Sequence, residues 1–178
     1  GTLLVVKQNG KVSIVAKGDT FIPESQLMSG AVLEEDNVTG KGFHNIEILQ
    51  AIEPGSSIIL DGDFEQVSID APLVNISIIS GTVGDLIIEQ SAKNPNIEIK
   101  EGAAVHTFTA DAGATVTGNG NIKTARINAN GVTIGKRPGN IVLADGVEAN
   151  IEGSVIKGGT SGSSGSGSTG GTTKIQAP

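Results

Sequence analysis

Short runs of β-branched residues recur about every 20 residues between residues 57 and 127, and this repeat limits the possible folds more than any other feature. When the sequence is aligned with itself at that period, apolar side chains fall into three columns. The columns are Phe64, Val83, Val105 and Ile122; Val67, Leu86, Phe108 and Ala125; and Ile69, Ile88, Ala110 and Ile127. Side chains that recur at a fixed period are expected to stack on one another, so each repeat is one unit of a stack.

Each repeat contains two predicted strands with a glycine corner between them. The strands are 57–60 and 64–69, then 75–79 and 83–89, then 96–100 and 105–109, with corners at Gly62, Gly81, Gly102 and Gly120. Residues such as Ile76 and Ile78 alternate with polar ones, as strands with one buried face require. No segment has the apolar period of a helix, and without helical connections the βαβ unit is excluded. These features predict an all-β chain that coils as a right-handed parallel β-helix, a β-solenoid; an antiparallel β-sandwich is the structural alternative.

The first 50 residues follow the repeat poorly. The segments 3–6 and 12–15 flank Asn9 and Gly10, a pair typical of a type I′ hairpin turn. We therefore predict an N-terminal capping hairpin that covers the first edge of the solenoid, since open strand edges promote aggregation. Residues 1–52 would hold this cap and the first rungs, and residues 1–157 the whole module.

The C-terminal segment has a different composition. Residues 158–173 are all Gly, Ser or Thr, which bury too little apolar surface to offset the entropy of ordering. We predict a linker over residues 158–178 that leads to a covalently attached neighbouring domain; a terminal tail is the alternative. The chain begins with Gly1 rather than Met, from which we expect a module cut from a larger protein.

Composition and charge disfavour several kinds of partner. The formal net charge is −7 and the pI about 4.7, and lysines and arginines are scattered, so we expect no nucleic acid as a partner. No apolar run approaches the length of a membrane span, so we expect no membrane partner either. The chain has no Cys, which excludes disulfides, zinc–thiolate sites and thiol nucleophiles.

No catalytic motif is present. His44 and His106 lie in different repeats without the spacing of a metal or catalytic pair, and we expect both to be structural or merely exposed. A pectate-lyase-like enzyme would share the fold and use calcium with a basic residue, but only Lys123 and Arg126 lie near the columns. Threonines are too few and misaligned for an ice-binding face. We therefore expect a module without catalytic activity of its own.

Acidic residues form the best candidate metal site. The repeat aligns three carboxylates directly after the third apolar column, followed by Asn128, and two more flank Gly62 near Glu65. The candidate ligands are Asp61, Asp63, Asp70, Glu89 and Asp111. Stacked carboxylates repel unless a cation neutralises them, and hard oxygen ligands suit calcium, so we predict bound calcium as a cofactor. A solvated acidic face is the alternative.

The segment 114–146 is similar to segments of surface-layer-associated proteins of Gram-positive bacteria. More narrowly, residues 56–158 resemble the family-54 carbohydrate-binding modules of modular clostridial laminarinases, β-1,3-glucanases with surface-layer-homology domains. The resemblance implies a right-handed β-helix that binds polysaccharides such as β-glucan, xylan and chitin. It also implies an attached glycoside hydrolase and an extracellular location at the bacterial cell surface.

Sugar-binding modules usually stack pyranose rings on Trp or Tyr, and this chain has neither, so a platform must use Phe or polar side chains. The other reading of the sequence is a structural spacer or adhesin stalk in a cell-surface protein.

Overall fold

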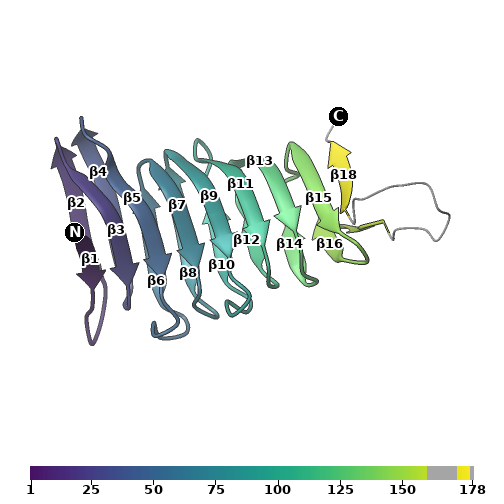
Figure 1. Cartoon of the computed structure of the whole chain (residues 1–178), viewed down its shortest axis with the longest axis horizontal. Helices are drawn as coiled ribbons and strands as arrows, with labels where there is room; N and C mark the ends of the chain where they lie inside the picture. Colours follow the sequence, from purple (N-terminus) through teal and green to yellow (C-terminus); the bar gives the residue numbers. More distant parts are fainter. Residues whose placement is uncertain (160–171, 177–178) are drawn as a thin grey trace.

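The chain forms an elongated β-solenoid in which sequence position advances along the long axis (Figure 1). This computed structural model describes residues 1–159 together with the backbone of residues 172–176. Within those residues the chain makes eight coils and contains no helix. The predicted all-β parallel solenoid is therefore confirmed, and the β-sandwich alternative is wrong.

Two nine-stranded sheets form the walls of the solenoid, and each coil contributes one strand to each sheet. The first sheet contains β1 (Thr2–Val5), β3 (Phe21–Leu27), β5 (Gly42–Ile48), β7 (Phe64–Ile69), β9 (Thr82–Ile88), β11 (Ala104–Ala110), β13 (Asn121–Ile127), β15 (Asn140–Ala144) and β18 (Thr172–Gln176). The second contains β2 (Val12–Gly18), β4 (Ala31–Val38), β6 (Ser57–Asp61), β8 (Asn75–Ser80), β10 (Asn96–Ile99), β12 (Thr115–Thr117), β14 (Val132–Ile134), β16 (Glu148–Ile151) and β17 (Ser154–Lys157).

The three predicted apolar columns are all present. In the register between β7 and β9, Val67 lies beside Leu86. The ladder continues to Phe108 on β11 and to Ala125 on β13, and all four side chains are buried. The columns that begin at Phe64 and Ile69 follow the same register. The stack confirms that one repeat of the sequence is one coil.

The coils differ in length although the ladders stay in register. Val67, Leu86, Phe108 and Ala125 are 19, 22 and 17 residues apart in the sequence. Because the strands pair directly, the connecting loops must absorb these differences. The loops at the two edges of the sheets are therefore the part of the structure that can vary without disturbing the core.

Branched aliphatic side chains fill the interior between the sheets. Aromatic rings enter it at a few places, such as Phe43 and Phe64, whose ring centroids lie 6.2 Å apart in a stacked arrangement. Phe108 is also fully buried. Side chains of this kind pack well in layers one strand spacing apart, about 4.8 Å, so each residue contacts its equivalents in the coils above and below.

The predicted N-terminal hairpin is wrong. β1 pairs in parallel with β3, and β2 pairs in parallel with β4, so the two strands lie in different sheets and form the first coil. The Asn9–Gly10 segment forms the corner between β1 and β2. A corner of this kind favours the same turn-forming residues as a hairpin turn does. Pairing with the second coil buries Val5 and Ala16, whereas Leu4 and Val15 stay exposed at this end.

The C-terminal end is built differently from the N-terminal end. β17 returns antiparallel along β16, and β18 lies antiparallel along β15. Most of the predicted linker, residues 160–171 and 177–178, lies outside the described residues. Its segment Thr172–Gln176 forms β18. The boundaries of the module at residue 157 and of the linker at 158–178 stay predictions.

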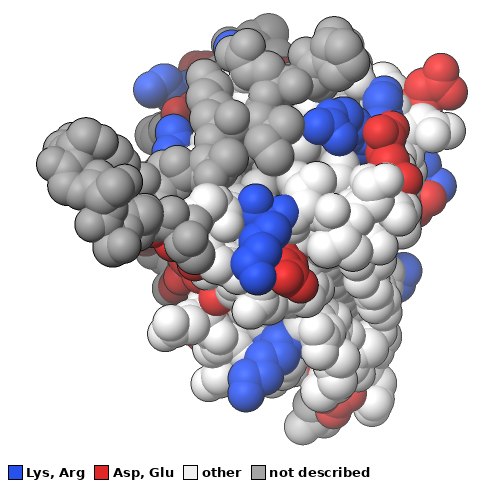
Figure 2. All heavy atoms as spheres, turned by 90° about the vertical axis from the view of Figure 1, so that its right-hand side faces the viewer, with Lys and Arg blue, Asp and Glu red and all other residues white. Residues whose placement is uncertain are grey.

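Charged side chains of both signs are interspersed on the end face that Figure 2 shows, with uncharged residues between them. One exposed ion pair joins the first two coils, between Lys17 and Asp36, whose Nζ and Oδ2 atoms are 2.6 Å apart. The described residues include no helix that is long and apolar enough to cross a membrane.

Truncation of the central column should destabilise the solenoid strongly. Leu86 is fully buried between Val67 and Phe108, and the flanking ladders prevent the backbone from collapsing into the gap. We expect Leu86→Ala to lower the free energy of unfolding by roughly 2 to 5 kcal/mol in chemical denaturation. The control Val155→Ala, whose side chain is 69% exposed, should change it by less than about 0.5 kcal/mol. Equal losses for the two variants would contradict the packing described here.

Candidate functional site

The strands of the first sheet share a bend near their beginning that sets up an outward-facing column. On β7, Phe64 and Val67 are buried, while Glu65 and Gln66 between them both face outward. Strict alternation of a strand would bury one of these two residues, so the backbone must turn there. The registers of β3 with β5, β7 with β9, β9 with β11 and β11 with β13 skip the same position, so the bend recurs from coil to coil.

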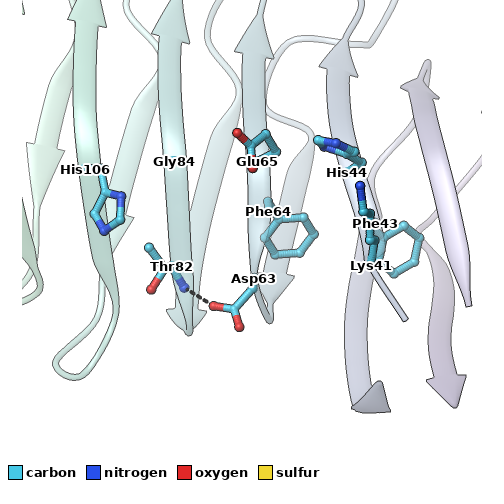
Figure 3. Close-up of a pocket in the computed structure, with 9 residues that line it drawn as sticks. All are labelled: Lys41, Phe43, His44, Asp63, Phe64, Glu65, Thr82, Gly84 and His106. Carbon is cyan, nitrogen blue, oxygen red and sulfur yellow. Dashed lines mark hydrogen bonds between the residues drawn. The ribbon is translucent and has the colours of Figure 1, made fainter. Parts of the chain in front are cut away.

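Four residues occupy this bend on neighbouring strands: His44 on β5, Glu65 on β7, Gly84 on β9 and His106 on β11. The residues that flank each bend are paired from strand to strand: Phe64 lies beside Val83, and Val83 lies beside Val105. The outward residues that follow them are therefore aligned in one column. His44 and His106 are three strand spacings apart, about 14 Å. Figure 3 shows the four residues on consecutive strands.

An open groove of about 540 Å³ lies over this column. Side chains at or just before the start of the strands complete its walls, with Asp63 and Thr82 along the middle of one side and Lys41 and Phe43 at the β5 end (Figure 3). The lining residues are Lys41, Phe43, His44, Asp63, Phe64, Glu65, Thr82, Gly84 and His106. The groove crosses four coils, so it runs along the solenoid axis rather than along a strand.

Gly84 makes the middle of the groove hollow. A Cβ atom at this position would lie 2.5 Å from the carbonyl oxygen of Glu65, closer than real Cβ contacts. No side chain therefore fits between the outward side chains of Glu65 and His106. The gap is a consequence of the close approach of two strands at the bend, not of a missing loop.

An exposed aromatic ring stands at the β5 end of the groove. Phe21 begins β3 and is 51% exposed, in contrast to the other three phenylalanines of the chain, which are buried. Its ring centroid is 5.8 Å from that of His44, and the Nζ atom of Lys41 lies 5.6 Å from the Phe21 centroid. In these three side chains, the Phe21 cluster, the Lys41 ammonium lies over the exposed ring and the His44 imidazole lies tilted beside it.

Two carboxylates lie in the groove, and they differ in their surroundings. The Asp63 Oδ1 atom accepts a hydrogen bond of 2.8 Å from the backbone N–H of Thr82, so this carboxylate caps the corner of the next coil (Figure 3). Glu65 is exposed at the bend. With Lys41 and two imidazoles as donors, the groove offers hydrogen-bonding groups of both kinds at its rim, and the buried rings of Phe43 and Phe64 lie beneath them.

Glu35 fixes the backbone at the start of the groove. Its Oε1 atom accepts a hydrogen bond of 2.8 Å from Phe43 N, and its Oε2 atom accepts one of 2.9 Å from Asp63 N. One carboxylate thus joins the corners of two successive coils. Gly42 and Gly62 leave the space for it, since Cβ atoms there would lie 1.7 Å and 2.7 Å from Glu35 atoms. Neither glycine was singled out for this role by the sequence.

The predicted calcium ligands at the corner are engaged with the next coil. Ser80 donates its hydroxyl to Asp61, and Thr82 donates its backbone N–H to Asp63, so both carboxylates bridge from the β6–β7 corner to the β8–β9 corner. Asp61 and Asp63 flank Gly62 as the sequence implied. Each carboxylate is matched with a neutral donor.

The other three predicted ligands stack in the ladder as expected, and they too accept hydrogen bonds from neighbouring coils. Ser91 donates to Asp70, Ser68 donates to Glu89 over 2.8 Å, and Asn128 donates to Asp111 over 2.7 Å. Among the residues that the structure describes, no three His, Asp or Glu side chains converge on a point where a metal ion could bind. Neutral donors between the carboxylates offer a second way to relieve their repulsion.

The groove itself was not predicted, and His44 and His106 were expected to be structural or exposed. The sequence carried a signal that could have joined them. At the spacing of the apolar columns, His44, Glu65, Gly84 and His106 directly follow Phe43, Phe64, Val83 and Val105. An alignment that followed the outward positions as well as the buried ones would have placed the two histidines on one face.

The chain is similar to a known protein in its three-dimensional structure. No protein-family model and no curated protein sequence matches the chain. Among solved structures, it is similar to part of the chitinase ChiW from Paenibacillus sp. str. FPU-7, described as a bacterial cell-surface-expressed multi-modular enzyme machinery. The TM-score is 0.80 with 29% sequence identity, over 94% of this chain and 15% of ChiW. The chain therefore spans about 15% of the length of ChiW.

Removal of the Glu35 carboxylate should loosen the groove and the first corners. Glu35→Ala leaves the backbone N–H groups of Phe43 and Asp63 without their acceptor, and we expect a loss of about 1 to 3 kcal/mol in unfolding free energy. Amide hydrogen exchange at these two residues should accelerate selectively. The control Glu101→Ala, at an exposed turn, should alter neither measurement. Unchanged exchange in Glu35→Ala would contradict the bridging role.

Proposed function

We propose that this chain is a non-catalytic polysaccharide-binding module whose binding site is the groove over His44, Glu65, Gly84 and His106. The observation that carries the proposal is the exposed Phe21 cluster beside an open groove that crosses four coils. A long, shallow groove of this kind suits an extended polymer better than a small molecule, which would be enclosed on most sides.

The Phe21 cluster supports sugar binding through two complementary contacts. The C–H face of a pyranose ring is apolar and packs on an aromatic ring, while its hydroxyl groups need hydrogen-bond partners at the edge. Phe21 supplies the ring, and Lys41 and His44 supply donors within about 6 Å of it. Glu65 and His106 would bind hydroxyls farther along the chain of the sugar polymer.

The groove also supports a binding role rather than hydrolysis. Glycosidases generally use two carboxyl groups, one as acid and one as base or nucleophile. Of the two exposed carboxylates that line this groove, Asp63 accepts the backbone N–H of Thr82 and so caps a corner, which leaves Glu65 as the one without this structural role. We therefore expect the isolated module to release no reducing sugar from any polysaccharide that it binds.

We propose β-glucan, xylan and chitin as the ligand class, and a bacterial cell-surface enzyme as the context. The similarity to part of a multi-modular cell-surface chitinase supports this context. The resemblance to family-54 modules of laminarinases adds β-glucan and an attached glycoside hydrolase, which the module would target to insoluble substrate. Covalently linked neighbouring domains would then follow the segment after residue 157.

A structural spacer or adhesin stalk is the second candidate. The observation that favours it is the elongated solenoid of eight coils, a shape that separates whatever is attached to its two ends (Figure 1). A spacer needs no groove, so the Phe21 cluster distinguishes the two functions.

Binding to insoluble polysaccharide should depend on the Phe21 cluster. We expect the module to sediment with chitin, β-glucan or xylan particles, and we expect Phe21→Ala and His44→Ala to weaken that binding by about tenfold or more, equal to about 1.4 kcal/mol. Depletion of the supernatant, measured against protein concentration, gives the affinity. Val155→Ala is the matched control, because it removes an exposed apolar side chain far from the groove.

Two results would count against the proposal. Wild-type protein that stays in the supernatant with all three polysaccharides would favour the spacer. Equal binding by Phe21→Ala, His44→Ala and the control would place the sugar site elsewhere on the solenoid.

We also propose that calcium binds through some of the carboxylates Asp61, Asp63, Asp70, Glu89 and Asp111. Stacked carboxylates one coil apart repel, and an ion bound only by the folded state stabilises it by mass action. The melting temperature should then be higher in excess calcium than in chelator. Superimposable melting curves, with no heat in a calorimetric titration of the metal-free protein, would contradict calcium binding. The carboxylates would then serve only to accept hydrogen bonds from their serine, asparagine and backbone donors.

A further inference from the structure

A second hollow of about 570 Å³ lies at the opposite edge of the first three coils from the groove. It is formed by the loops that follow β1, β3 and β5, whereas the groove lies where β5, β7 and β9 begin (Figure 1). We call it the loop pocket. Its side chains include Lys7, Lys11, Ser29, Ser56 and Ser57, and the proposed polysaccharide function does not use any of them.

Two ammonium groups gather in the loop pocket although the chain as a whole carries a charge of −7. Over the described part of the chain, three ion pairs lie within 4.0 Å, and neither Lys7 nor Lys11 takes part in them. The Nζ atom of Lys7 donates to the carbonyl oxygen of Lys11 over 3.2 Å, which uses one of its three N–H groups. Glu53 also borders the pocket and is exposed.

A buried hydroxyl in the same pocket has no partner. Ser29 is only 6% exposed, and its Oγ atom makes no hydrogen bond within the described structure. A buried polar group without a partner costs free energy, and Ser29 Oγ is one of four such atoms among the described residues and the one whose residue lines the loop pocket. Ser29 lies in the second coil, between the corner that carries Lys7 and Lys11 and the serines of the third coil. Its Oγ atom has almost no accessible surface, so a ligand held by the lysines would bond to it once the Ser29 side chain turns toward the pocket.

Glycines keep the backbone of the loop pocket accessible. Gly10 and Gly30 both line it. A Cβ on Gly30 would lie 3.0 Å from the carbonyl oxygen of Ser57 and 3.3 Å from Cγ of Lys11, and one on Gly10 would lie 3.6 Å from Nζ of Lys7. Side chains at these positions would fill the space between the lysines and Ser29. The pocket is therefore both open and lined with donors.

We propose that the loop pocket binds an oxyanion, a carboxylate or phosphate group of an acidic glycan, through Lys7, Lys11 and Ser29. Both kinds of group accept hydrogen bonds from ammonium and hydroxyl donors, and ammonium contacts to them are charge-assisted. The site lies on other loops than the groove, so binding there does not rest on the neutral polysaccharide function.

The test is an NMR titration of the whole chain at fixed ionic strength with three probes: inorganic phosphate, glucuronate and glucose. We expect saturable shifts of the Gly10, Ser29 and Gly30 amides with phosphate, glucuronate or both, and none with glucose. The responses to phosphate and to glucuronate together identify the source of the oxyanion. A response to phosphate alone indicates a phosphate-bearing polymer, and a response to glucuronate alone indicates a uronic acid.

Matched variants distinguish binding at this site from a nonspecific effect of the positive charges on the protein surface. The double variant Lys7→Gln, Lys11→Gln should raise the dissociation constant at least tenfold, and Ser29→Ala should raise it while both lysines stay in place. The double variant Lys100→Gln, Lys157→Gln removes the same charge from two other places on the surface and should leave binding unchanged. Lys7 and Lys11 are exposed, so their variants should keep the wild-type melting temperature.

Shifts that rise linearly without saturation, shifts that are the same in both double variants, or an equal response to glucose would each overturn the oxyanion site. Sedimentation with neutral polysaccharide should be the same for Lys7→Gln, Lys11→Gln and wild type. A failure of the loop pocket is thereby distinguished from a failure of the groove.

Discussion

The parallel hydrogen-bond ladder between successive coils is the constraint on which the rest of this structure depends. Each described strand from β3 to β14 pairs with the strand one coil before it and with the strand one coil after it. Like positions are thereby brought together at one strand spacing, and an apolar side chain is stabilised mainly by its equivalents in the adjacent coils. This explains how a chain without Trp or Tyr builds an interior: Val67, Leu86, Phe108 and Ala125 form one continuous contact although no two are close in sequence.

The same ladder arranges the outward residues, and the candidate sites follow from it. A residue placed at the bend of one strand is carried in register to the bend of the next, so His44, Glu65, Gly84 and His106 share one face without any loop to assemble them. Where a corner must be held, carboxylates join one coil to another, as Glu35 does by accepting the N–H groups of Phe43 and Asp63. Acidic residues that suggested a metal site in the sequence thus have a structural use in linking coils.

The sequence predicted the interior well because burial imposes a strict choice of side chain at every coil. The strands 57–60 and 64–69 and their successors were placed within one or two residues for that reason. The N-terminal hairpin was misplaced because Asn9 and Gly10 favour a tight change of direction whether the next strand pairs with the last one or crosses to the other sheet. Local residues do not specify which of these two pairings forms. The pairing of β1 with β3, which lies in the second coil, decides it. The groove was missed because the outward column carries His, Glu, Gly and His in turn, so its two histidines are separated by unlike residues.

The unequal lengths of the coils have a functional consequence. Ladder register is kept across repeats of 19, 22 and 17 residues, so the extra residues extend the loops at the sheet edges. Substitutions in these loops change the side chains at the sheet edges without altering the buried columns. A rigid scaffold commonly carries its binding residues on loops of this kind. In the first three coils, the loops at one edge bring Lys7, Lys11 and Ser29 together, while the opposite corners place Lys41 beside the groove. Because both edges are tied to one ladder, a polymer held at the groove and an acidic group held at the loop pocket would bind to a common rigid frame, and the distance between them would be set by the length of the strands rather than by flexible segments.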